Sequence, residues 1–492
     1  MTKPGSPSRP LRVAIIGSGP SGFFATACLQ KQPLTVEIDM FDRLPTPYGL
    51  VRGGVAPDHP DIKSVARVFD RLAAHSGYRF FGNVTVGKDI SHDELARRYD
   101  AVIYAVGAQS DRRLGVPGED LTGIHAATEF VGWYNGHPDY RDSFFDLSQE
   151  SVAVVGLGNV AMDVARILGS ACEDLSGTDI ASHALEALRA SRVKTIYILG
   201  RRGPAQAAFT NPEIRELGEL ADVDMVVAPE ELKLDEATRA AIARDENPTT
   251  RENLETLTEY ASRAPSGRRK QIVVRFLVSP VAFHGPGRVK AMTLMPNCLE
   301  PDGRGGVKAV ETGETETVPV GLVFRSVGYR GVPVPGLPFD QRTAVIPNAA
   351  GRVLAAPGAT ETIPGVYVVG WIKRGPSGVI GTNKPDAQES VSLLLQDLRD
   401  GKLPAPEAPS REAVHRLLEE RGIDVISYED WRRLDQIELA RGKEVGRPRI
   451  KFCRVEEMLE AVRPTRTARG GEDYVEGRTA FMAKRKSIFK SR

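Results

Sequence analysis

The apolar run at residues 11–16 leads into a glycine-rich turn, Gly17-Ser-Gly19-Pro-Ser-Gly22. A helical pattern then extends to about residue 31, and a second apolar run covers residues 34–41. A strand, a glycine turn, a helix and another strand make up the βαβ unit of a dinucleotide-binding sheet. The pattern therefore predicts such a unit near the beginning of the chain.

The same arrangement returns in the middle of the chain. Residues 151–155 are apolar and precede Gly156-Leu-Gly158-Asn-Val-Ala161, a helical pattern to about residue 168, and a strand over residues 194–199. A lone G-x-G-x-x-G is weak evidence, but inside a whole βαβ unit it favours nucleotide binding over a turn without a ligand. Two dinucleotide-binding sheets are therefore expected.

Further apolar runs of strand length lie between and after these units. They cover residues 99–105, 271–278, 288–294, 318–327 and 365–369, and from about residue 385 the pattern becomes helical. The predicted fold class is α/β, with two Rossmann-like dinucleotide-binding domains and a helical C-terminal extension.

The glycines of the first turn have a structural role. They let the chain turn tightly and let a pyrophosphate approach the backbone, where the helix N-terminus offers unpaired N–H groups. We expect a side chain at Gly17, Gly19 or Gly22 to block that approach.

The residue that ends the second strand distinguishes the two units. The first ends at Asp42, whose carboxylate can bond the ribose diol of FAD or NAD. The second ends at Gly200-Arg201-Arg202-Gly203, where two guanidinium groups suit a 2′-phosphate, although a plain surface pair of arginines remains the alternative. FAD in the first unit and NADPH in the second would allow a hydride to pass between them.

Composition narrows the class of protein. The 492 residues are 41% hydrophobic, enough for two or three domains, and no run reaches the 18 apolar residues of a membrane helix. The net charge of +1 selects no nucleic acid, and the four cysteines form no C-x-x-C pair that would indicate a redox disulfide or a bound metal. We expect a cytoplasmic protein with a short disordered arm at residues 1–10 and a basic, frayed tail at residues 484–490.

Several longer motifs make the sequence recognisable. They are Pro47–Arg52 (PYGLVR), Val55–Pro60 (VAPDHP), Gly158–Arg166 (GNVAMDVAR), Gly200–Thr210 (GRRGPAQAAFT), Ser326–Arg330 (SVGYR) and Gly370–Gly381 (GWIKRGPSGVIG). With these motifs the chain resembles the adrenodoxin-reductase-type ferredoxin–NADP reductases, and especially their bacterial members. The resemblance extends to about residue 390.

The resemblance implies that an NADP-binding domain is inserted into an FAD-binding domain. The expected boundaries are 1–111 and 335–492 for the FAD domain and 112–334 for the NADP domain. The position of the second βαβ unit in the middle of the chain agrees with this order.

The resemblance also implies which residues contact FAD. Many related flavoproteins end a strand with Gly-Asp, whereas Trp371 follows Gly370 here, as in this narrower family. The implied contacts are Gly17, Gly19, Ser21, Gly22, Asp42, Leu50 and the strand residues near Val86, with Trp371, Gly378, Val379 and Ile380 at the ring. Backbone N–H groups at 378–380 would favour negative charge on the reduced ring.

For NADP, the implied contacts lie mainly in the middle of the chain. They are Leu157, Gly158, Asn159 and Val160 at the pyrophosphate, Arg201 and Arg202 at the 2′-phosphate, and Arg112, Glu213 and Gly378 nearby. Without the resemblance, Glu213 would be interpreted as an acidic residue that favours the helix dipole, and Arg112 as an ordinary surface arginine.

The resemblance places the counterparts of His59 and Asp163 beside the flavin as the catalytic candidates. We expect them to orient water or tune charge, because hydride transfer itself requires only cofactors and geometry.

The implied electron acceptor is a ferredoxin-type iron–sulfur protein, acidic in most cases. It would dock on a basic cleft face with Lys373, Arg374 and Lys384 as candidates. The alternatives are an NADPH diaphorase that reduces quinones, a non-catalytic NADP sensor, and an electron-input subunit. The last of these, like a disulfide reductase, would require cysteine clusters that this chain lacks.

Overall fold

The computed structural model describes residues 4–234, 248–303, 306–407 and 410–469, together with residues 236, 238, 239 and 242. The basic tail predicted at 484–490 lies outside these residues. The chain forms two compact units, and each is built from separate segments of the sequence. The first unit comprises Met1–Arg52, Asp61–Ala108 and Gly331–Arg492, and the second comprises Gly53–Pro60 and Gln109–Arg330.

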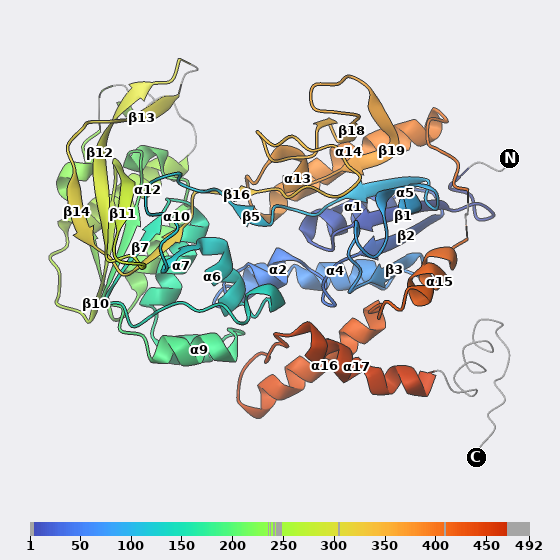
Figure 1. Ribbon diagram of the computed structural model, residues 1–492, viewed down its shortest axis with the longest axis horizontal. Helices are drawn as coiled ribbons and strands as arrows, with labels where there is room; N and C mark the ends of the chain where they lie inside the picture. Colours follow the sequence, from blue (N-terminus) through green and yellow to red (C-terminus); the bar gives the residue numbers. More distant parts are fainter. Residues whose placement is uncertain are drawn as a thin grey trace. The chain divides into compact units, whose positions relative to one another are not determined.

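The first unit is organised around a parallel sheet (Figure 1). Its strand order is β3-β2-β1-β4-β19, and the short β18 and β17 continue it antiparallel. The bounds are β1 Leu11–Ile16, β2 Val36–Phe41, β3 Tyr78–Phe81, β4 Ala101–Tyr104, β17 Asn348–Ala349, β18 Arg352–Leu354 and β19 Thr362–Val368. All residues of β1 are buried because it lies between β2 and β4, as an unbroken apolar run in a parallel sheet requires.

Helices cover this sheet and extend beyond it. Helix α1 (Pro20–Gln30) packs against α14 (Asn383–Arg399), so two segments far apart in sequence lie side by side. The shorter helices are α2 Leu50–Gly53, α3 Pro60–Lys63, α4 Ala66–Ala73, α5 His92–Ala96 and α13 Trp371–Arg374. The orange and red end of the chain in Figure 1 contains α15 (Ala413–Glu420), α16 (Tyr428–Glu444) and α17 (Val455–Arg469).

The second unit contains a parallel sheet with the order β6-β15-β7-β8-β10-β9. The bounds are β6 Ile124–Ala126, β7 Ser151–Val155, β8 Thr195–Leu199, β9 Val223–Val227, β10 Lys270–Arg275 and β15 Leu322–Arg325. The helices are α6 Ala127–Tyr134, α7 Asn159–Gly169, α8 Cys172–Ser176, α9 Ser182–Arg189, α10 Asn211–Glu219 and α12 Pro248–Ser262.

A separate antiparallel sheet lies between β10 and β15 in the sequence. It consists of β11 Val278–His284, β12 Ala291–Pro301, β13 Val307–Glu311 and β14 Glu316–Pro319. A two-stranded pair, β5 Ser110–Asp111 and β16 Tyr329–Arg330, joins the two ends of this unit.

The topology determines where a nucleotide can bind. In each sheet the strand order reverses beside the first strand of the βαβ unit, between β1 and β4 and between β7 and β15. Ligands of open α/β sheets bind at the carboxyl ends of the strands at such a reversal. Both glycine turns directly follow β1 and β7, so both lie at these positions.

Several expectations are corrected by the structure. The first residues are not a disordered arm from Gly5 onward, because Thr35 donates to the Gly5 carbonyl at 2.9 Å and the Arg9 guanidinium bonds Asp100 at 2.6 and 3.0 Å. Val86 lies in a turn bridged to Ile90 and not in a strand. The run 318–327 is divided between β14 and β15. Among the described residues, no helix is both long and apolar enough to cross a bilayer.

Candidate active site

The three glycines of the first turn have different tasks. A Cβ on Gly17, whose φ is +106°, would lie 2.5 Å from the carbonyl oxygen of Ala105, and one on Gly22 would lie 2.2 Å from the carbonyl oxygen of Gly17. A Cβ on Gly19 would meet nothing within 4 Å. The fold itself therefore requires glycine at positions 17 and 22, while the open space at Gly19 fits the expected approach of a ligand.

The second turn repeats this division. A Cβ on Gly156, whose φ is +141°, would lie 2.2 Å from the carbonyl oxygen of Ser326, whereas one on Gly158 would meet nothing within 4 Å. Helices α1 and α7 begin after Gly19 and Gly158 without a capping side chain. In the part of the chain that the structure describes, each helix therefore has an uncapped N-terminus, at the positive end of its dipole, beside an open space, an arrangement that fits a pyrophosphate.

Asp42 follows β2 and faces the first turn. Its carboxylate accepts hydrogen bonds from the backbone N–H of Ser18 and from that of Leu44, each at 3.0 Å. The Ser18 hydroxyl donates to the same carboxylate. A carboxylate has about four acceptor positions, so it retains capacity for a ribose hydroxyl.

Arg201 and Arg202 follow β8, and their backbones are held in place. The carbonyl of Arg201 accepts from the Asn297 side chain at 3.0 Å, and that of Arg202 accepts from the N–H of Leu277 at 3.1 Å. Arg201 is exposed and Arg202 is half-buried. Within the described ranges neither guanidinium has a carboxylate at ion-pair distance, unlike Arg275, which pairs with Glu231. Both groups are therefore available for an anionic ligand.

The turn after β19 lies on the first turn of α1. A Cβ on Gly370 would lie 2.1 Å from the Ser21 hydroxyl, and that hydroxyl donates to Asn383 at 3.0 Å. The Trp371 indole N–H donates to the carbonyl of Ser377 at 3.1 Å and closes the next loop. The contacts of Ser21 with Gly370 and Asn383 place the implied ring contacts at 371–380 in the same unit as the first glycine turn.

The loop at 378–380 is open to solvent. Val379 is 59% exposed, and in the part of the chain that the structure describes, no acceptor is recorded for the N–H groups of Val379 and Ile380. Leu50, another implied flavin contact, is also exposed. Backbone donors without a protein acceptor can bind the polar edge of a ligand.

Lys373 is not part of a docking surface. It is only 7% exposed, and its ammonium group pairs with Glu389 at 2.6 Å and Asp386 at 3.2 Å. Arg374 is occupied as well, because its guanidinium bonds Asn383 at 2.9 Å. The prediction of a docking role is wrong for Lys373, and Lys384 remains exposed.

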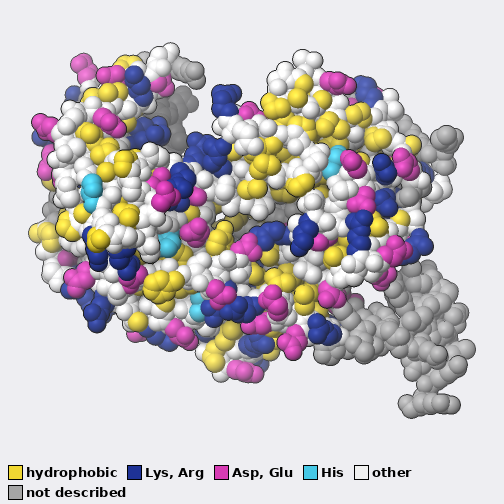
Figure 2. Space-filling view, viewed as in Figure 1, with side chains coloured by type: hydrophobic (Ala, Val, Ile, Leu, Met, Phe, Trp, Pro, Cys, Tyr) yellow, Lys and Arg dark blue, Asp and Glu magenta, His cyan; other side chains and the backbone are white. Residues whose placement is uncertain are grey.

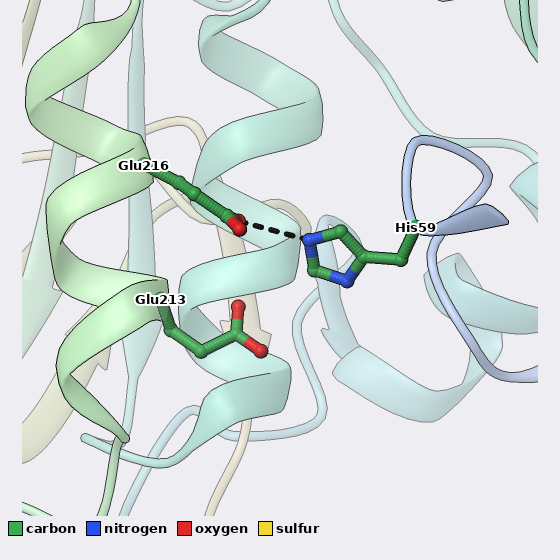
Figure 3. A group of neighbouring side chains, drawn as sticks. All are labelled: His59, Glu213 and Glu216. Atoms are coloured by element: carbon green, nitrogen blue, oxygen red, sulfur yellow. Dashed lines mark hydrogen bonds and ion pairs between the residues drawn. The ribbon is translucent and has the colours of Figure 1, made fainter. Parts of the chain in front are cut away.

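His59 lies in a cluster of carboxylates within the second unit (Figure 3). Its Nε2 is 2.9 Å from Glu216 Oε2, and its Nδ1 is 3.9 Å from Asp163 Oδ1. The structure therefore brings His59 and Asp163 together, and adds Glu213 and Glu216 from one face of α10.

Arg166 lies at the centre of this cluster. The side chain is almost fully buried, and its guanidinium contacts Asp163 at 2.6 Å, Asp58 at 2.7 Å, and Glu213 and Glu216 at 3.1 Å each. The ligand atoms of His59, Glu213 and Glu216 lie within 4.8 Å of one another, a spacing that also suits a metal ion. The guanidinium already occupies the cationic position between these carboxylates.

One guanidinium faces four carboxylates, and burial opposes the charged form of two of them, Asp163 and Glu213. Burial, and next the charge of Asp163, raise the pKa of Glu213 to about 7. Burial also raises the pKa of Asp163. The group can therefore exchange protons near neutral pH, which suits a site that manages charge during a redox reaction.

Comparison with known proteins identifies the family. Residues 11–198 match the family described as pyridine nucleotide-disulphide oxidoreductase. NADPH-ferredoxin reductase FprA of Mycobacterium tuberculosis is 48% identical over 92% of this chain and 99% of that protein. Mitochondrial NADPH:adrenodoxin oxidoreductase of Salvelinus fontinalis is 42% identical over 93% of this chain and 92% of its own length. The solved structure of Mycobacterium tuberculosis FprA in complex with NADPH matches with a TM-score of 0.87 and covers 92% of this chain and 99% of that one.

The chain belongs to the adrenodoxin-reductase-type ferredoxin–NADP reductases. The predicted family and the α/β fold class with a helical C-terminal region are confirmed. Cys28, Cys172, Cys298 and Cys453 are unpaired in this structure.

Sequence reasoning about this reductase missed Asp58, Arg166 and Glu216. A usable signal was present, because Asp163 and Arg166, and likewise Glu213 and Glu216, are three residues apart on helices and so share one face. No spacing in the sequence could show that residues 53–60 join these two helices.

Proposed function

We propose that this chain is an FAD-containing, NADPH-dependent reductase whose electron acceptor is a ferredoxin-type iron–sulfur protein. The observation that carries the proposal is the contrast between two glycine turns, one faced by Asp42 and the other followed by two free guanidinium groups. The relatives named for NADPH and for ferredoxin or adrenodoxin support it. When bound, NADPH supplies a hydride, and FAD takes two electrons together and releases them singly.

The first unit is assigned as the FAD domain. Gly17, Gly19, Ser21 and Gly22 would form the pyrophosphate turn, and Asp42 would bond the ribose. Leu50, Val86, Trp371, Gly378, Val379 and Ile380 would contact the rest of the cofactor. The open space at Gly19, the uncapped helix and the unpaired N–H groups at 379 and 380 fit such a ligand.

The second unit is assigned as the NADPH domain. Leu157, Gly158, Asn159 and Val160 would hold the pyrophosphate, and Arg201 and Arg202 would bind the 2′-phosphate. Arg112 is exposed and without a recorded ion pair in the described structure, so it can serve as a further phosphate contact. Glu213 faces Arg166 instead, so its contribution to this site is electrostatic.

We assign His59 and Asp163 to charge management while the flavin accepts hydride. The His59 ring is bonded to Glu216, and burial raises the pKa of the neighbouring Glu213 to about 7. Replacing His59 by Gln removes the titratable ring while keeping a side chain that can donate a hydrogen bond. We expect slower flavin bleaching by NADPH in stopped-flow absorbance, and an unchanged rate would rule out this role.

The partner would be bound through charge at the rim of its docking surface. Figure 2 shows acidic and basic side chains interspersed on the visible face, in agreement with a net charge of +1, so any attraction must be local. Lys384 is an exposed basic residue on α14 that is available for such a contact.

The proposal is tested with the purified protein. Flavin bands should be visible and should bleach much faster with NADPH than with NADH. Turnover on a ferredoxin should exceed turnover on a quinone, and the opposite ratio would favour a diaphorase. A colourless preparation to which FAD does not bind would overturn the proposal.

A further inference from the structure

The C-terminal helices contain a fully buried carboxylate that the proposed chemistry does not use. Glu438 in α16 is 0% exposed. It accepts hydrogen bonds from both terminal nitrogens of Arg52, with Nη1 at 2.9 Å, from Arg449 at 3.1 Å, and from the N–H of Phe452 at 2.9 Å. Removing one partner of a buried ion pair leaves the other charge uncompensated, which strongly destabilises the surrounding structure.

The same helix also contacts the other end of the loop that contains Arg52. The Arg52 guanidinium lies 5.1 Å from the centre of the Trp431 ring, and the Trp431 indole N–H donates to the Tyr48 hydroxyl at 3.3 Å. Lys451, which follows α16, donates to the carbonyl of Arg52 at 3.4 Å. Residues 428–452, which we name the C-terminal brace, therefore hold both ends of a short segment, the turn at Tyr48 and Gly49 and the start of α2 at residues 50–52, which we name loop 48–52.

Loop 48–52 requires such support. Tyr48 has a φ of +85°, a strained conformation for a bulky residue. The loop also lies directly on the first glycine turn. The N–H of Tyr48 donates to the carbonyl of Ser18 at 3.0 Å, and a Cβ on Gly49 would lie 2.9 Å from the Cα of Gly19. Gly19 is the glycine of this turn that opens onto free space.

We propose that the C-terminal brace holds loop 48–52 against the pyrophosphate turn and thereby controls how long the protein retains its flavin. This inference rests on the proposed FAD site in the first unit. Glu438 and Trp431 act through Arg52 and Tyr48, so they are positioning residues. The carboxylate and the indole N–H help to hold Tyr48 and Gly49 in their left-handed conformation next to Gly19, and loss of either one weakens the hold of the brace on the loop.

The experiment measures FAD release from the holoprotein by the increase in flavin fluorescence after dilution. Glu438→Gln should release FAD about tenfold faster or more, because a neutral amide cannot balance two guanidinium groups. Trp431→Phe keeps an aromatic ring beside Arg52 but replaces the buried indole with a smaller ring and removes its N–H, so it should release FAD a few-fold faster. Glu444→Gln on the same helix is the control, because Glu444 is exposed and has no recorded partner among the described residues, and it should match the wild type.

A second measurement separates positioning from general damage. Excess FAD should restore kcat in both variants, with an unchanged KM for NADPH. If Glu438→Gln does not fold, Trp431→Phe decides the question. The proposed role of the brace would be overturned if the folded variants released FAD at the wild-type rate, or if excess FAD did not restore their kcat. A wild-type protein that binds no FAD would instead overturn the proposed function.

Discussion

Coenzyme choice should depend on Arg201 and Arg202, and the double substitution Arg201→Ala with Arg202→Ala tests this. Both side chains follow β8, where many dinucleotide-binding domains place a carboxylate that bonds the ribose. Neither guanidinium has an ion-pair partner among the described residues, so removing them leaves no unpaired carboxylate in the protein. The change therefore removes ligand contacts with little cost to folding.

The expected loss in kcat/KM for NADPH depends on how exposed the two guanidinium groups are. A hydrogen bond to a charged group contributes about 1.5–3 kcal/mol, and the lower end applies here because Arg201 is exposed and Arg202 is half-buried. Two such contacts give about 3 kcal/mol, which is roughly a 100-fold loss in kcat/KM for NADPH. NADH has no 2′-phosphate, so its kcat/KM should change little.

The assay is stopped-flow bleaching of the flavin over a range of NADPH and NADH concentrations. Arg189→Ala is the matched control, because Arg189 is an exposed arginine at the end of α9 in the same unit. The two coenzymes should become nearly equal in the double variant only. If the preference for NADPH survives there, the assignment of the second turn to NADPH through these arginines is wrong.

Three further outcomes are expected. Gly19→Ala should fold normally yet bind FAD weakly, whereas Gly22→Ala should lose stability because its Cβ would lie 2.2 Å from a backbone oxygen, and melting curves with flavin content would show the difference. Burial raises the pKa of Glu213 to about 7, so the folded chain binds a proton that the unfolded chain has lost, and the stability this group contributes falls as pH rises through about 7. The free energy of unfolding of Glu213→Gln should therefore exceed that of the wild type by about 1 kcal/mol near pH 5, rising to about 3 kcal/mol near pH 8. Equal melting temperatures across that range would contradict this. Turnover with a ferredoxin should fall with salt while dye reduction does not, and parallel salt responses would argue against charged docking.

Features encoded over short stretches of sequence could be predicted. Strand β1 and strand β7 begin and end at the predicted residues, because an unbroken apolar run before a glycine turn has few other solutions. The short strands β3 and β9 were not predicted. Each lies at or next to a sheet edge and carries a weaker apolar signal.

The cluster around Arg166 depended on contacts between distant segments. His59 and Asp163 were candidates only through family resemblance, and nothing in their local sequence placed them together. The structure joins residues 53–60 to α7 and α10 through the ion pairs of Asp58 and His59. The burial that raises the pKa of Glu213 arises only when these three segments meet.

The sequence alone determined the two βαβ units, the glycines of their turns and the opposite charges at their strand ends, because each is set by residues within about 50 positions of one another. Tertiary structure decided which polar groups are free and which are already paired. The sequence predicts Lys373 as a docking residue, whereas the structure buries it against Asp386 and Glu389. Glu438 has no predicted role, whereas the structure pairs it, fully buried, with Arg52 of loop 48–52. The physical reason is that the partner and the burial of a charge are set by segments that the chain brings together only when it folds.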